Sequence, residues 1–286
     1  MQAIKNSLTD AGQPSDRMRV LDGYRTLAIM LVLAFHYCSR WTQPNFAENL
    51  YPYGDLLRDL PLAGHGYLGV QLFFIISGFV IALTLISSKD WLDFALRRTA
   101  RLFPTMVLCA VITFAMLAIL PVSYFEPRLV DFLPSLTFIE PYLWERALGT
   151  PVRAIDEAYW SLFIEVQFYL WASLLFFVFG KARFLASFTV FLNAVLLLMV
   201  AGALASSKSI LFLGDHVFAA SHLSWFGAGI AFFYLHLDRG NRLARLLAVE
   251  TLTVSIAQAL LRNAAAEIPY YLAFYALFVL FVFRRQ

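Results

Sequence analysis

Apolar runs alternating with short polar segments dominate the pattern along the chain. A helix advances about 1.5 Å per residue, so about 20 apolar residues cross the hydrocarbon core of a bilayer. The pattern predicts about eight membrane spans, at residues 25–37, 67–86, 102–120, 159–179, 184–204, 219–235, 246–261 and 268–283. We therefore expect an all-α fold, a polytopic transmembrane helical bundle.

Composition points to the same class of protein. Hydrophobic residues make up 60% of the 286 positions and charged residues only 14%, and the mean hydropathy is +0.70. Soluble domains carry about 25% charged residues. The net charge of +3 suits the basic cytoplasmic loops of a membrane protein, so it gives no reason to expect a nucleic-acid partner. We expect a multi-pass protein of the bacterial inner membrane.

The distribution of basic residues predicts the orientation. If the N-terminus is cytoplasmic, 15 of the 22 lysines and arginines fall in the lead, the inner loops and the tail. Positive charge gathers on the cytoplasmic side, so this asymmetry predicts that both termini lie inside. We expect a cytoplasmic lead over 1–24 and a single transmembrane domain over 25–286. Within it, residues 121–157 are too polar to cross and too apolar to be disordered, which favours a surface or re-entrant segment.

Arg25 and His36 lie on one face of the first predicted span. Eleven residues separate them, which places them on the same side of a helix and about 16 Å apart. A polar stripe on a membrane helix is expected to face protein or trapped water. Imidazole can act as general base or acid, or carry an acyl group. The alternatives are a structural core histidine and a snorkelling arginine, which could pair with Asp22.

Arg98 and Arg101 lie three residues apart at the predicted cytoplasmic entrance to the third span, where Pro104 is expected to open the helix. Guanidinium groups bind phosphate with paired hydrogen bonds, so these two could hold a phosphate-bearing donor. Glu165, within the fourth predicted span, could orient a catalytic group or accept a proton. The structural alternatives are an ordinary basic cluster for the two arginines and an ion pair for Glu165.

Other polar residues favour structural roles. Ser77 and Gly78 have the small side chains that close helix packing uses, and no nucleophile motif surrounds them. The remaining residues that could bind a metal ion are His65, His216, His222 and Asp215. Their spacing does not place them on one helix face, so we expect no metal site.

Four stretches together resemble the membrane acyltransferase-3 family, bacterial enzymes that acylate surface sugars. They are LDGYR (21–25) with His36, GVQLFFIISGF (69–79), RRTARLFP (97–104) and YWSLFIEVQFY (159–169). The resemblance implies that Arg25 and His36 serve acyl transfer, that Arg98 and Arg101 hold the coenzyme A part of the donor, and that Glu165 lies in the same site.

Two features depart from the family pattern. Gln71 stands where the family often has an acidic residue, and the family's usual Ser-Tyr and Tyr-Leu-x-His pattern is not found before Gln286. The second departure suggests a short or truncated member.

The hypothesis is an integral membrane O-acyltransferase that moves an acetyl or other short acyl group from cytoplasmic acyl-CoA to a hydroxyl of a surface carbohydrate. Its partners would be membrane lipid, acyl-CoA and the carbohydrate acceptor. One alternative is a transporter or flippase for a polar lipid or sugar, because intramembrane His, Arg and Glu also mark translocation paths. The other is an inactive truncated family member.

Overall fold

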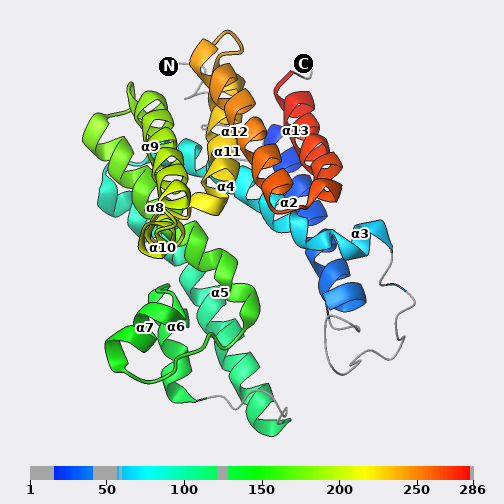
Figure 1. The fold of residues 1–286 in the computed structure, drawn as a ribbon, viewed down its shortest axis with the longest axis vertical. Coiled ribbons are helices and arrows are strands. Elements are labelled where there is room, and N and C mark those ends of the chain that lie inside the picture. Colours follow the sequence, from blue (N-terminus) through cyan, green and yellow to red (C-terminus); the bar gives the residue numbers. More distant parts are fainter. Residues whose placement is uncertain (1–15, 41–56, 58–59, 121–127, 284–286) are drawn as a thin grey trace. The chain divides into compact units, whose positions relative to one another are not determined.

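The computed structural model describes residues 16–40, 57, 60–120 and 128–283 (Figure 1). All regular structure among these residues is helical, which confirms the expected all-α fold. The chain forms two compact units: unit 1 comprises Met1–Ala82 and Ser221–Gln286, and unit 2 comprises Leu83–Ala220. Residues 1–15 of the predicted cytoplasmic lead lie outside the described part. The expectation of a single transmembrane domain stays a prediction.

Unit 1 is formed by helices from both ends of the chain. Its elements are α2 (Asp16–Phe35), the π-helical turn η1 (His36–Arg40), α3 (Pro61–Gly64), η2 (Gly66–Leu68), most of α4 (Gly69–Ser87), nearly all of α11 (Ala220–Leu237), α12 (Arg242–Leu261), η5 (Ala265–Glu267) and α13 (Ile268–Phe283).

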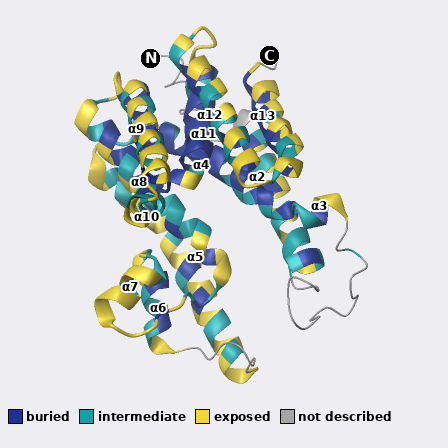
Figure 2. Ribbon diagram, in the orientation of Figure 1, coloured by how far each residue is buried: buried dark blue, intermediate teal, exposed yellow. Residues whose placement is uncertain are grey.

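Helices α4 and α11 form the core of unit 1 and are its most buried elements (Figure 2). Their backbones touch at two glycines. A methyl group on Gly78 would overlap the backbone carbonyl of Phe226, and one on Gly229 would lie 2.6 Å from the backbone nitrogen of Phe79. Small residues permit this close approach of membrane helices. The structure thus confirms the packing role that the sequence favours for Gly78, and that of Ser77 stays a prediction.

Hydrogen bonds join η5 and α13 to the N-terminal part of unit 1. The hydroxyl of Tyr24 donates to the carbonyl of Leu277 at 2.8 Å, and the hydroxyl of Tyr270 donates to the carbonyl of Pro61 at 2.9 Å. The hydroxyl of Tyr67 donates to Oε1 of Glu267 at 2.6 Å. Segments about 200 residues or more apart in the sequence are therefore fixed side by side.

Unit 2 contains the middle of the chain. Its elements, after the end of α4, are α5 (Trp91–Ile119), η3 (Leu129–Asp131), α6 (Phe132–Thr137), α7 (Pro141–Leu148), η4 (Glu157–Tyr159), α8 (Trp160–Phe179), α9 (Phe184–Leu204) and α10 (Lys208–Phe218).

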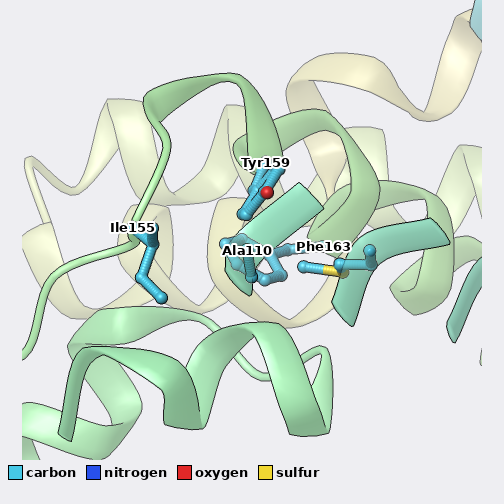
Figure 3. Packing of buried hydrophobic residues seen from close by; sticks show 5 residues of the cluster. Ala110, Ile155, Tyr159 and Phe163 are labelled. Atoms are coloured by element: carbon cyan, nitrogen blue, oxygen red, sulfur yellow. The ribbon is translucent and has the colours of Figure 1, made fainter. Parts of the chain in front are cut away.

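Helices α5 and α8 pack antiparallel in unit 2. Near the start of α8, Tyr159 and Phe163 join Met106 and Ala110 of α5 in a buried apolar cluster that also includes Ile155 (Figure 3). Farther along α8, the ring of Tyr169 lies 6.3 Å from that of Phe94, near the start of α5. The order of these contacts is reversed along the two helices, which fixes their relative direction.

Helix α5 begins earlier than the sequence predicts. The expectation that Pro104 opens the third span is wrong, because Pro104 lies inside a helix that starts at Trp91. The side chain of Asp90 caps this helix by accepting from the backbone N–H of Asp93, and Asp93 pairs with Arg97 at 2.8 Å. The charged residues lower the local hydropathy, so the sequence predicts that this stretch is a loop. In the structure they stabilise the start of the helix, as a cap and as an ion pair between residues four apart.

The segment expected at the surface or re-entrant, 121–157, contains ordered short helices, and its residues 121–127 are outside the described part. Asp131, whose side chain is 1% exposed, holds the segment together. Its carboxylate accepts from the backbone N–H groups of Arg128 and Arg153, each at 3.0 Å, and from Nη2 of Arg128 at 3.2 Å. A buried carboxylate needs such donors, so this ion pair organises the chain between α5 and α8.

Seven helices among the described residues are long and apolar enough to cross a membrane, whereas the sequence predicts about eight spans. The first predicted span corresponds to α2, which is not among the seven. Charged residues in the first half of α2, such as Asp22 and Arg25, lower its hydropathy. The expected cytoplasmic position of both termini stays a prediction.

Candidate active site

The predicted site residues divide between the two units. Arg25 and His36 belong to unit 1, whereas Arg98, Arg101 and Glu165 belong to unit 2. The structure describes each group within its own unit.

Arg25 and His36 lie at the edge of the packed face of α2. Leu21 and Ala28 form the centre of that face and are buried. Arg25 and His36 are half-buried, and Ile29, which lies one turn after Arg25 on the same side of the helix, is 47% exposed. At about 100° per residue, the stripe is rotated away from the buried side of the helix. Arg25 and His36 therefore lie at the edge of the buried face of α2 and not at its centre.

Local interactions hold both side chains. Nη1 of Arg25 lies 2.7 Å from Oδ1 of Asp22, which confirms the pairing that the sequence allows. His36 is the first residue of the π-helical turn η1, and its ring lies 5.4 Å from that of Phe35. Helix α2 thus changes its hydrogen-bonding pattern at His36. Turns of this type occur often at functional sites.

Arg98 is buried in unit 2, with only 8% of its surface exposed. Its Nη2 donates a hydrogen bond to the hydroxyl of Thr84. Its guanidinium carbon lies 5.5 Å from the ring centre of Tyr169 and 5.9 Å from that of Phe94. Aromatic faces attract cations at such distances. Because Tyr169 is near the middle of α8, Arg98 lies opposite the middle of that helix, not at its end as an ordinary boundary arginine would.

Tyr169 connects Arg98 to Glu165. Its hydroxyl donates to Oε1 of Glu165 at 2.5 Å, one helical turn earlier, while its ring lies beside the Arg98 guanidinium. The structure therefore brings Arg98 and Glu165 into one chain of interactions. A guanidinium, a phenol and a carboxylate so arranged can bind an anion and hold a proton.

Arg101 differs from Arg98 in its environment. Arg101 lies about one turn after Arg98 on α5, and its side chain is exposed. The two arginines would therefore meet a phosphate from different environments, one buried and one exposed. Arg98 and Tyr169 line a cleft of about 110 Å³ whose other walls include Phe138, Val166 and Leu170. Sites that enclose a whole small molecule usually measure about 300–1,000 Å³. This cleft fits one group of a ligand, such as a phosphate or a thioester.

Two further expectations concern a metal and Gln71. Among the described residues, no group of three or more His, Cys, Asp or Glu side chains could hold a metal ion. Gln71 of α4 is buried, and its Oε1 has no hydrogen-bond partner within the described part of the chain. It therefore leaves an uncharged polar atom inside unit 1, where the resemblance leads one to expect an acid.

Sequence reasoning missed Thr84 and Tyr169 as partners of Arg98. A signal for Tyr169 was available, because it follows Glu165 by four residues and therefore shares its helix face. No comparable signal existed for Thr84, which precedes Arg98 by fourteen residues and meets it only because the chain turns between α4 and α5.

The part of the chain that the structure describes contains seven long apolar helices with ionisable side chains within them, which define a multi-pass helical membrane protein. The sequence profile of an acyltransferase domain, that of the acyltransferase-3 family, matches residues 18–285. The chain therefore belongs to the acyltransferase-3 family, as its motifs led us to expect.

Three relatives illustrate the similarity. The chain is 30% identical over 167 residues to O-acetyltransferase OatA of Staphylococcus aureus, covering 52% of this chain and 23% of that protein. It is 26% identical over 170 residues to peptidoglycan O-acetyltransferase OatA of Listeria monocytogenes, covering 52% and 22%. It is 32% identical over 93 residues to an O-acetyl transferase of Shigella phage Sf6, covering 32% and 25%. The matches thus span a quarter or less of these relatives. No solved structure matches the chain.

Proposed function

We propose that this protein is an integral membrane O-acyltransferase of the bacterial inner membrane. It moves an acetyl or other short acyl group from cytoplasmic acyl-CoA to a hydroxyl of a surface sugar or polysaccharide precursor. The observation that carries the proposal is the family match, which includes both the α2 residues and the α5–α8 residues. The names of the relatives support acetyl as the group and a cell-wall polymer as the acceptor.

The roles follow from the chemistry of each side chain. Arg98 and Arg101 bind phosphates of the donor, because guanidinium groups suit phosphate geometry and Arg98 is already positioned by Thr84 and two aromatic rings. Glu165, held by Tyr169, keeps Arg98 oriented through the shared phenol. These groups make the α5–α8 cleft the donor side of the site.

His36 and Arg25 supply the transfer chemistry. The imidazole of His36 takes the proton of the acceptor hydroxyl as that oxygen attacks the acyl carbonyl, and the thiolate of coenzyme A leaves. Arg25 stabilises the negative charge that develops on the carbonyl oxygen. Its pairing with Asp22 is exposed to solvent and weak enough to exchange for a ligand.

The first experiment compares His36→Ala with the matched control His65→Ala in purified protein reconstituted in nanodiscs. His65 is an ordered histidine of the same unit whose ring stacks on Tyr270. With radiolabelled acetyl-CoA and a polysaccharide acceptor, His36→Ala should reduce label transfer to background, while His65→Ala keeps it. Undiminished transfer by His36→Ala would reject the assignment.

The same label separates an enzyme from a transporter. In sealed liposomes, an acyltransferase leaves the label covalently attached to the acceptor. Accumulation of unmodified acceptor inside the vesicles, with no label on it, would instead identify a transporter.

A further inference from the structure

A second polar cluster in unit 2 joins three elements that are far apart in the sequence. Glu140 precedes α7, Gln167 lies on α8 and His216 lies near the end of α10. Nδ1 of His216 lies 2.6 Å from Oε2 of Glu140. The amide nitrogen of Gln167 donates to Oε1 of Glu140 at 3.2 Å and to the backbone carbonyl of His216 at 2.9 Å. The carboxylate is therefore bound by two side chains at once.

The side chain of Glu140 is directed away from the helix that follows it. It is the N-cap residue of α7, yet its side chain makes no capping hydrogen bond there and is directed to His216 instead. A histidine whose Nδ1 is held by a carboxylate has a fixed ring orientation, which presents Nε2 to a ligand. Among the described residues, no hydrogen bond is made to Nε2 of His216.

The cluster lines a cleft of about 360 Å³, within the usual size of a ligand site. Its walls also include the aromatic rings of Phe138 and Trp171. The indole nitrogen of Trp171 donates to the carbonyl of Val217 at 2.7 Å, which fixes that ring in place. Rigid aromatic faces beside a few polar groups form a site that can orient a partly polar ligand.

Charge distinguishes this cleft from the one beside Arg98. None of the described residues that line it is a lysine or arginine, and the carboxylate of Glu140 disfavours phosphate. Amide, imidazole and carboxylate groups beside aromatic rings suit a neutral molecule with several hydroxyl groups. The two clefts have three wall residues in common, namely Phe138, Val166 and Leu170. An anion held at Arg98 and a neutral ligand held at His216 would therefore be neighbours.

We propose that the cleft at His216, Glu140 and Gln167 binds the carbohydrate acceptor, with Nε2 of His216 hydrogen-bonded to one of its hydroxyl groups. This inference rests on the proposed function and adds the acceptor subsite to it. His216 is a positioning residue here, and the transfer chemistry stays with His36. The cleft also links the acceptor to the segment organised by Asp131, which contributes Glu140.

Two substitutions of His216 distinguish ligand binding from a structural role. In His216→Asn, the amide nitrogen takes the place of Nδ1 and keeps the bond to Glu140, but nothing replaces Nε2. In His216→Gln, the amide nitrogen takes the place of Nε2. We expect His216→Asn to raise the KM for chitotetraose about tenfold, as for the loss of one hydrogen bond to the ligand, and to leave the KM for acetyl-CoA unchanged. His216→Gln should restore part of the loss. Glu145→Gln, which removes an exposed carboxylate of α7, is the control and should resemble the wild type.

Binding without donor separates this inference from the proposed function. Equilibrium dialysis of labelled chitotetraose against the protein in nanodiscs needs no acyl transfer. Binding that His216→Asn weakens about tenfold supports the subsite even if no acyl group is ever transferred. If transfer depends on His36 but both His216 variants have wild-type KM and binding, the proposed function survives and the subsite is wrong. Binding of inorganic phosphate that requires His216 would also overturn it.

Discussion

The hydrogen bond from Tyr169 to Glu165 allows a sharp test of the proposed donor side. Tyr169→Phe removes only the hydroxyl, because the ring that faces the Arg98 guanidinium at 5.5 Å is retained. Glu165→Gln keeps the shape of the side chain and removes its charge. If Glu165 acts through Tyr169, the two changes weaken the same interaction, because Tyr169→Phe removes its donor and Glu165→Gln removes the charge of its acceptor.

The size of the effect follows from the type of bond. A hydrogen bond to a charged group contributes about 1.5–3 kcal/mol, equivalent to about 10- to 150-fold in kcat/KM if the whole bond is needed for transfer. Glu165 is only half-buried, so solvent screening favours the lower end of this range. We expect each single variant to lower kcat/KM for acetyl-CoA about tenfold.

The assay is a double-mutant cycle, with release of coenzyme A measured on the protein in nanodiscs. The double variant should be about as active as either single variant, because residues that share one interaction are not additive. Losses that multiply to about a hundredfold would show that Glu165 and Tyr169 act independently. Wild-type activity of Tyr169→Phe would remove the phenol from the proposed site altogether.

Three further predictions concern buried contacts. Arg98→Lys should raise the KM for acetyl-CoA at least about tenfold, because an ammonium cannot replace the planar guanidinium beside the two rings. Arg97→Lys, at an exposed position, is the control and should leave this KM unchanged. Equal KM values for the two variants would refute the phosphate role of Arg98. Gly78→Ala should destabilise the protein by about 1–3 kcal/mol, because the added methyl group would overlap the backbone of Phe226. This would be seen as thermal unfolding at a lower temperature in detergent. The methyl group of Gly23→Ala meets open space, so this control variant should unfold at the wild-type temperature. Asp131→Asn should make the 121–157 segment more sensitive to limited proteolysis, because it removes the charge that accepts the hydrogen bonds from Arg128 and Arg153. An unchanged digestion pattern would contradict this.

The predicted helix boundaries agree with the structure at some helices and differ at others. The spans expected at 184–204 and 268–283 coincide with α9 and α13, because a polar residue directly precedes each apolar run, Arg183 before α9 and Glu267 before α13. The start of α5 was misplaced, since the charged residues before Arg98 extend a helix instead of forming a loop. Helix α10 was not predicted at all. Ser207 caps this helix by accepting from the backbone N–H of Ile210, and the helix packs back on α9, where Gly214 lies against Met199.

The sequence by itself determined the helical membrane fold, the family and the identity of the candidate chemical groups. These follow from local hydropathy and from short motifs, which neighbouring residues define without reference to distant parts of the chain. Only the tertiary structure decided which side chains meet. Arg98 is placed against Thr84 and Tyr169, and His216 against Glu140, by contacts between residues that are 14 to 76 positions apart in the chain. Such pairings depend on how the helices pack, and no local pattern encodes them.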